Sequence, residues 1–110
     1  MRTHNVCRLR VYSDDSDHYA GKPFYQWLVE EAHRRGLRGA TVVRGTMGFG
    51  GHSEIHTNKV FALAADLPVV VEIIDSREKI HDFVESFHGQ LEKGLTTIED
   101  VDTALFPGTE

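Results

Sequence analysis

The sequence predicts an α+β fold of the ferredoxin-like type, a βαββαβ sandwich in which a four-stranded antiparallel sheet carries two helices on one face. Three observations lead to this prediction. Short segments alternate between apolar and polar residues, two longer segments repeat apolar residues at helical spacing, and the order is strand, helix, strand, loop, strand, helix, strand. With 110 residues, 40% of them hydrophobic, the chain suits a single domain over residues 1–110.

The first strand is predicted from Cys7 to Tyr12, where apolar and polar residues alternate. Cys7, Leu9 and Val11 share one side of such a strand, and we expect that side to be buried. Because the thiol falls on the buried side, we expect it to be inert rather than reactive.

The first helix is predicted from about Pro23 to Arg35. Proline is well suited to a first helical turn, and Gly36 can end the helix in the left-handed conformation. An apolar stripe fixes the buried side of the helix: Phe24, Trp27, Leu28 and Ala32. On the exposed side the i,i+4 spacing predicts two ion pairs, Glu30 with Arg34 and Glu31 with Arg35.

The second strand is predicted from Gly39 to Gly45, which is rich in β-branched residues. It leads into residues 46–52, where three glycines in four positions make a regular element unexpected, so we predict a flexible loop. The third strand is predicted from Val69 to Ile74, an almost continuous apolar run.

The second helix is predicted to begin after Ser76, whose hydroxyl can cap its first turn, and to end at Gly94. Its apolar positions follow helical spacing: Ile80, Phe83, Val84, Phe87 and Leu91. Gly89 weakens this helix by up to about 1 kcal/mol. A last strand is predicted within Thr97 to Leu105.

Two helices cover only one face of such a sheet, so the other face needs an explanation. In the third strand Val69, Val71 and Ile73 are expected to face the helices, which leaves Val70, Glu72 and Ile74 on the open face. This mixture of apolar and charged residues predicts a homo-oligomer in which the open faces meet, with Arg8 or Arg10 paired to Glu72. The alternative is a solvated face with scattered apolar residues, since exposed apolar atoms are normal.

The charge of the chain excludes some functions. Its net charge is −5, which argues against non-specific binding of nucleic acid. The first 55 residues carry a net charge of +2 and the remainder −7, and this asymmetry predicts complementary surfaces within an oligomer. A single cysteine, the absence of an apolar leader and the absence of a membrane-spanning run favour a cytoplasmic protein without direct membrane insertion.

The glycine-rich segment 45–51 follows a strand, and free backbone N–H groups in such a segment can form a nest for an anion. Arg44 before it and Lys59 after it can supply positive charge to a phosphate or a carboxylate. The candidate ligand-binding residues are Arg44, Gly45, Gly48, Gly50, His56 and Lys59. The alternative is a hairpin-like loop that binds nothing.

His52, Glu54 and His56 form a candidate site for a divalent metal, because either a helix or a strand can bring these side chains to one face. Three such ligands without cysteine do not make a closed structural zinc site. The alternative is a set of polar loop residues that hydrogen-bond to a ligand or to the backbone. No pair of nucleophile and base stands out, so the sequence predicts a protein that is not an enzyme.

With these elements placed, the sequence resembles the family called domain of unknown function 190, a branch of the PII-like proteins. The matching segments cover roughly residues 7–103 in the order of the family: 21–25 (GKPFY), 39–45 (GATVVRG), 48–50 (GFG), 55–57 (IHT), 66–75 (DLPVVVEIID) and 93–101 (KGLTTIEDV). The resemblance implies a ferredoxin-like protomer that assembles as a homotrimer with the sheets lining the centre. It also implies a T-loop after the second strand, which responds to adenine nucleotides held between subunits.

The resemblance therefore implies a signalling or sensor protein that binds a small ligand and regulates a partner through the T-loop-like segment. PII proteins that bind ATP have a turn rich in glycine and lysine after the second helix, whereas this chain has only Lys93-Gly94 there. The sequence is therefore as consistent with a smaller nucleotide or an anion as the ligand as it is with ATP. Members of the family tend to be encoded near a fluoride-exporter type membrane protein, which implies a membrane-transporter partner. The alternative function is a divalent-metal-binding trimer similar to the CutA proteins, which share this fold.

Overall fold

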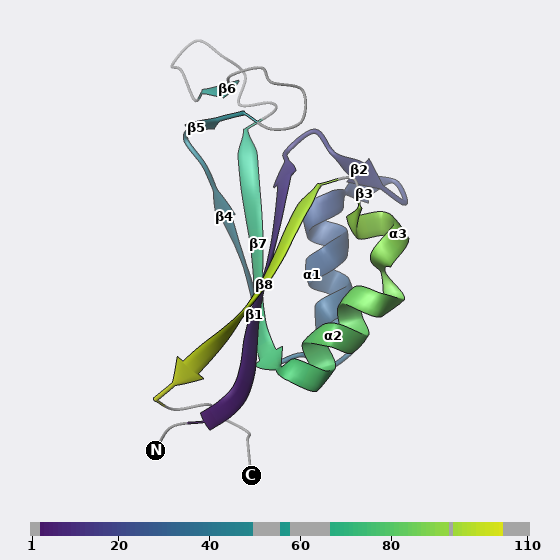
Figure 1. The fold of residues 1–110 in the computed structure, drawn as a ribbon. Helices are drawn as coiled ribbons and strands as arrows, with labels where there is room; N and C mark the ends of the chain where they lie inside the picture. Colours follow the sequence, from purple (N-terminus) through teal and green to yellow (C-terminus); the bar gives the residue numbers. More distant parts are fainter. Residues whose placement is uncertain (1–2, 50–55, 58–66, 93, 105–110) are drawn as a thin grey trace.

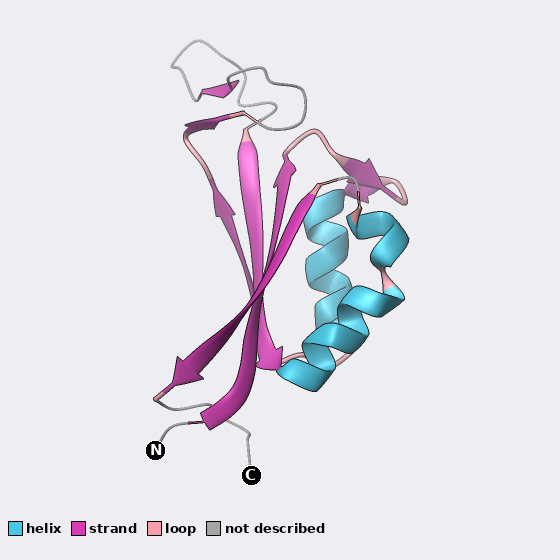
Figure 2. Ribbon diagram, viewed as in Figure 1, coloured by secondary structure: helices cyan, strands magenta, loops and turns pink. Residues whose placement is uncertain are grey.

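The computed structural model of the chain describes residues 3–49, 56–57, 67–92 and 94–104. In these residues a four-stranded antiparallel sheet has the strand order β4-β7-β1-β8, and the helices lie on one of its faces (Figure 1 and Figure 2). Its strands are β1 (Thr3–Asp14), β4 (Gly39–Arg44), β7 (Pro68–Ser76) and β8 (Leu95–Thr103). The helices are α1 (Phe24–Arg34), α2 (Arg77–Ser86) and the short α3 (His88–Leu91). The predicted ferredoxin-like fold is confirmed.

Two short hairpins complete the described elements. The strands β2 (His18–Tyr19) and β3 (Lys22–Pro23) pair between β1 and α1. The strands β5 (Met47–Gly48) and β6 (His56–Thr57) pair after β4. Our expectation that residues 46–52 form no regular element is wrong for Met47 and Gly48, because β6 supplies an antiparallel partner for both residues.

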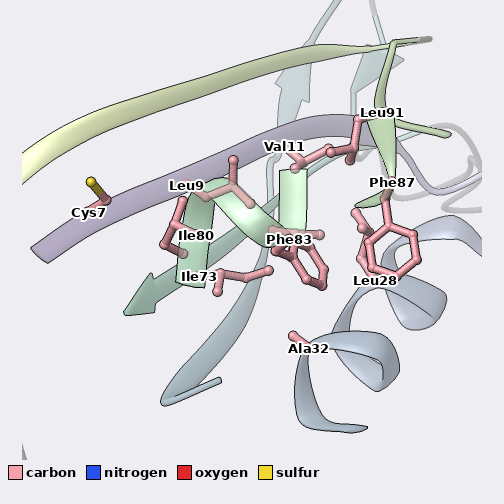
Figure 3. Packing of buried hydrophobic residues seen from close by; sticks show 11 residues of the cluster. Cys7, Leu9, Val11, Leu28, Ala32, Ile73, Ile80, Phe83, Phe87 and Leu91 are labelled. Carbon is pink, nitrogen blue, oxygen red and sulfur yellow. The ribbon is translucent and has the colours of Figure 1, made fainter. Parts of the chain in front are cut away.

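The core lies between the sheet and the helices (Figure 3). Strand β7 alternates strictly between buried and half-buried residues, and Val69, Val71 and Ile73 are fully buried as predicted. Together with Val71 and Ile73, the main cluster contains residues of β1, of the three helices, and Phe87 between α2 and α3: Cys7, Leu9, Val11, Leu28, Ala32, Ile80, Phe83, Phe87 and Leu91. The alternation of apolar residues along the strands therefore fixes which sheet face meets the helices.

Helix α1 begins directly after Pro23 and is followed by Gly36, whose φ of +75° is the left-handed conformation expected there. The predicted ion pairs on its surface are wrong. Glu31 pairs with Arg34, three residues away, and Glu30 accepts a hydrogen bond of 2.6 Å from the Lys22 ammonium. Arg35 instead reaches across to the second helix.

The second helical segment contains a break that the sequence pattern did not predict. The Ser76 hydroxyl caps α2 as expected and accepts a hydrogen bond from the backbone N–H of Lys79 at 3.3 Å. The helix then stops at Ser86, because Phe87 adopts φ −118° and ψ 25° before α3 begins. The Phe87 ring packs edge-on against Phe83 at 4.9 Å between centroids, and the Arg35 guanidinium lies 4.6 Å from its centroid.

Cys7 is fully buried in the sheet, as predicted (Figure 3). Its thiol donates a hydrogen bond of 3.3 Å to Asp100 on β8. Asp100 also pairs with Arg77 at 2.6 Å. Burial raises the pKa of the Cys7 thiol, and the bond to Asp100 raises it further. The folded protein therefore holds the thiol in its protonated, unreactive form.

We expect Cys7 to react with a disulfide reagent at mildly alkaline pH at least about tenfold more slowly in the folded protein than in denaturant, because burial keeps the reagent from the thiol and the raised pKa lowers the thiolate fraction. The rate of thiolate release, followed by absorbance, measures this. In the control variant Asp100→Asn the rate should rise only in part, since burial remains. Equal rates in the folded and denatured states would contradict the expectation.

Candidate functional site

The face of the sheet opposite the helices carries three rows of residues that run across all four strands. The first row is apolar and consists of Val43, Val70, Tyr12 and Leu95. The second is polar and consists of Thr41, Glu72, Arg10 and Thr97. The third consists of Gly39, Ile74, Arg8 and Glu99. Residues that are paired in register share a face, so each row is a continuous strip.

Ion pairs within the chain hold the charged residues of this face. The Arg10 Nε donates to Glu72 at 3.0 Å within the chain, whereas the sequence predicted a pairing of Arg8 or Arg10 with Glu72 where the open faces of two copies meet. Arg8 donates to Glu99 at 2.8 Å, and Arg10 also lies 3.5 Å from the same Glu99 oxygen. Two arginines thus meet two glutamates, and the charge of the face is balanced inside one chain.

The apolar row is well exposed. Leu95 retains 63% of its accessible surface, Val43 56% and Tyr12 38%. Scattered exposed apolar residues are ordinary, but a strip across four neighbouring strands beside a charge-balanced row has the composition of a protein interface. Association of this face with another copy of the chain stays a prediction.

At the end of β4 the side chain of Arg44 is held by Asp15, which lies just after β1. The Arg44 Nε and Nη2 donate three hydrogen bonds of 2.9–3.1 Å to the two Asp15 oxygens. The guanidinium also lies 5.9 Å from the centroid of the Tyr25 ring and 3.5 Å from its hydroxyl. These bonds, first of all to Asp15, raise the pKa of Arg44 above its already high ordinary value. Half of the Arg44 side chain nevertheless remains exposed.

The two predicted site glycines that the structure describes, Gly45 and Gly48, pack against Pro68. The Gly45 N–H donates to the Pro68 carbonyl at 2.7 Å, so this N–H is already occupied. A Cβ added to Gly45 would lie 2.8 Å from the Pro68 Cγ, and one added to Gly48 would lie 3.1 Å from it. Close packing against Pro68 therefore requires glycine at position 45 and gives a reason for glycine at position 48. Neither reason depends on a bound ligand.

The structure brings together part of the predicted site. Arg44, Gly45 and Gly48 lie at one end of the sheet, and the backbone of His56 pairs with Gly48. Gly50 and Lys59, together with the candidate metal ligands His52 and Glu54, lie outside the described residues. The anion nest and the metal site both stay predictions. Among the residues that are described, no group of three His, Cys, Asp or Glu side chains could hold a metal ion.

Sequence analysis missed Asp15 and Tyr25 as partners of Arg44. A signal for Asp15 was available. In a ferredoxin-like sheet β1 and β4 are both antiparallel to β7, so β1 and β4 run parallel and their carboxyl ends lie at the same edge (Figure 1). The acidic turn after β1 and the arginine that ends β4 are therefore neighbours in the predicted fold itself.

Two solved structures have folds similar to that of this chain. Both are of CPII, a nitrogen regulatory PII-like protein from Thiomonas intermedia K12, one bound to ADP, AMP and bicarbonate and the other to ADP and bicarbonate. Their TM-scores are 0.71 and 0.68, with 15% and 16% sequence identity over 96% of this chain and 92% and 93% of theirs. The chain thus has a PII-like ferredoxin-like fold.

Residues 6–103 match the family named domain of unknown function 190, described as "Uncharacterized ACR", and the chain belongs to this family. One relative is a UPF0166 protein of Aquifex aeolicus, 49% identical over 93% of this chain and 96% of its own length. Another is a UPF0166 protein of Methanocaldococcus jannaschii, 29% identical over 84% of this chain and 85% of its own length. The helices within the described residues are too short or too polar to cross a membrane.

Proposed function

We propose that the protein is a non-enzymatic PII-like regulator that binds a small anionic ligand, an adenine nucleotide or an anion such as bicarbonate, between the subunits of a homotrimer. The observation that carries the proposal is the half-exposed side chain of Arg44 at the end of β4. It lies at the edge of a sheet whose open face carries an exposed apolar row suited to association with another copy of the chain. The similar fold of a PII-like protein bound to ADP, AMP and bicarbonate supports the choice of ligand.

In this proposal the ligand competes with Asp15 for Arg44. The Asp15 carboxylate makes three hydrogen bonds to the guanidinium, and a phosphate or bicarbonate offers oxygens with the same geometry. The backbone N–H of Asp15 donates to the Leu67 carbonyl at 2.9 Å, next to the Pro68 that contacts Gly45. Displacement of Asp15 would therefore move the Leu67–Pro68 backbone, to which Asp15 is hydrogen-bonded.

The response proposed is a change in the segment that follows β4. Gly45 and Gly48 rest against Pro68, so a shift of the Leu67–Pro68 backbone alters how this T-loop-like segment is held. A ligand that binds only one arrangement shifts the population toward it. The surface presented to a partner, for which a membrane transporter is our candidate, changes with that population. Gly50, His56 and Lys59 are proposed to complete the ligand site.

Calorimetry with ADP, AMP and bicarbonate tests this proposal. We expect Arg44→Met to weaken binding by about tenfold to a hundredfold, because a hydrogen bond to a charged group contributes about 1.5–3 kcal/mol. The matched control is Arg34→Met, which removes an exposed arginine that pairs with Glu31 at the carboxyl end of α1 and makes no contact with the residues of the proposed site in the described part of the chain. Unchanged affinity in Arg44→Met, or no binding of any of the three ligands by the wild type, would contradict the proposal.

A further inference from the structure

A second candidate site lies within one chain, where the β2–β3 hairpin faces α3 and the beginning of β8 (Figure 1). It is a pocket of about 600 Å³, a volume within the usual range for small-molecule sites. Ser13, Asp17, His18, Tyr19, Phe24 and Gln90 are among the residues that line it. Arg44 is not among them, so the pocket is separate from the site proposed above.

Hydrogen bonds and ring contacts hold the walls of this pocket in place. The Gln90 amide donates to the Tyr19 hydroxyl at 3.1 Å and so joins α3 to the hairpin. The Tyr19 ring packs edge-on against Trp27, with 4.7 Å between centroids. The Asp17 carboxylate accepts bonds from the Ser13 hydroxyl at 2.7 Å and from the Asp14 N–H at 3.0 Å. The pocket is therefore largely formed before any ligand arrives.

The polar groups of the pocket are mainly hydrogen-bond acceptors. Asp17 contributes a carboxylate. His18 places its Nδ1 atom 2.7 Å from the Ser16 carbonyl. Because a carbonyl can only accept, Nδ1 carries the proton, and in the neutral ring Nε2 is left as an acceptor. The Gln90 side chain donates through its nitrogen to Tyr19, which leaves its carbonyl oxygen as a further acceptor.

The charge and the aromatic residues select the kind of ligand. Among the described residues that line the pocket none is lysine or arginine, and the charged side chain among them is the Asp17 carboxylate. Three aromatic residues, Tyr12, Tyr19 and Phe24, line it together with Asp17. Aromatic rings and a carboxylate both attract an organic cation, the first through the ring quadrupole and the second by direct charge pairing.

We propose that this pocket binds a small organic ammonium ion, a protonated amine carried on an apolar or aromatic body. The ammonium lies by the Asp17 carboxylate, with His18 Nε2 as a further acceptor, and the body packs among the aromatic residues. This is the opposite charge preference from the anion site at Arg44, and binding here does not depend on Arg44.

A series of three probes with the same ring tests the charge preference: phenethylamine as the cation, 2-phenylethanol as the neutral analogue and 3-phenylpropionate as the anion. The readout is the fluorescence of Trp27, the single tryptophan of the chain, because its ring contacts Tyr19 in the pocket wall. We expect saturable changes with affinity decreasing from the cation to the neutral compound to the anion. Binding of the anion as tight as that of the cation, or no saturable change with the cation, would overturn the proposal.

Two variants locate the site. Asp17→Asn keeps the size and one acceptor oxygen of the side chain, and it should weaken phenethylamine binding about tenfold while 2-phenylethanol binding stays the same. Gly89→Leu places a side chain at a lining residue where an added Cβ meets nothing within 4 Å, and it should block all three probes. Gly89→Ala is the matched control and should still bind.

If Gly89→Leu does not fold, which its thermal unfolding would reveal, Asp17→Asn alone decides: an equal loss for the cation and the alcohol, or no loss for either, would overturn the role of the carboxylate. Arg44→Met should bind phenethylamine as the wild type does. A loss of amine binding in that variant would show that the two sites are one and would also overturn the proposal.

Discussion

Replacement of Val70 by glutamate is expected to convert the proposed trimer into a monomer. Val70 lies in the centre of the apolar row, between Val43 on β4 and Tyr12 on β1. If the open sheet faces meet as proposed, a glutamate there would be buried without a partner, because Arg8 and Arg10 are already paired with Glu99 and Glu72. A buried charge without a partner costs several kcal/mol, roughly the scale that separates a stable interface from none.

Light scattering coupled to size-exclusion chromatography measures this result. The wild type should have three times the mass of one chain, and Val70→Glu the mass of one. The matched control is His81→Glu, which places the same charge on the exposed side of α2 and should remain trimeric. A wild type that is monomeric at micromolar concentration, or a trimeric Val70→Glu, would show that this face is not the interface.

Such a monomer would also separate the two ligand proposals. The anion site is proposed to lie between subunits, so Val70→Glu should lose affinity for ADP or bicarbonate together with its trimeric state. The described residues that line the pocket beside Asp17 belong to one chain, and Tyr12, which the pocket shares with the apolar row, is still present in the monomer. Val70→Glu should therefore keep its affinity for phenethylamine. The two outcomes differ because one site needs a neighbouring copy and the other does not.

Much of the fold could be predicted because the spacing of apolar residues over short stretches of sequence determines the type of each element and its buried side. The alternation in β1 and β7 identifies the buried face, since strand geometry sends neighbouring side chains to opposite sides. The break at Phe87 could not be predicted from helical spacing, because that residue sits at a correct core position. Its backbone departs from the helix while its ring packs on Trp27 and Phe83, a tertiary contact that no local pattern records.

The candidate site was predicted only in part, for a similar reason. Arg44 could be singled out as a cation beside a glycine-rich segment, but its partner Asp15 lies 29 residues earlier in the chain. The glycines were interpreted as a nest for an anion, whereas at Gly45 the space taken by Pro68 gives a separate reason for glycine. Sequence spacing identifies residue types that can bind a ligand, but it does not show which of their atoms are already occupied.

The charge asymmetry of the sequence has a cause inside the chain. We expected it to mark complementary surfaces of an oligomer. Arg8 and Arg10 from the first half instead pair with Glu99 and Glu72 from the second, because β1 lies between β7 and β8 in the sheet. The order of strands therefore brings Arg8 and Arg10 of the basic half against Glu99 and Glu72 of the acidic half within one chain. The apolar row is what the open face offers to the proposed association with a second copy.

Replacement of Phe83 by alanine is expected to have the largest effect on stability, with a loss of about 3–5 kcal/mol in the free energy of unfolding. The Phe83 side chain retains 1% of its accessible surface and belongs to the cluster that joins α2 to the sheet (Figure 3). Its removal takes away the transfer energy of the ring, leaves a cavity, and ends the edge-on contact with Phe87.

Denaturant unfolding of the wild type and the variant at equal protein concentration measures the loss, since assembly makes apparent stability depend on concentration. Glu85→Ala, on the exposed side of the same helix, is the control and should change the free energy of unfolding by no more than about 0.5 kcal/mol. Phe83→Leu should lie between the two, because it refills most of the volume. A loss below about 1 kcal/mol for Phe83→Ala would mean that the core can close around the missing ring.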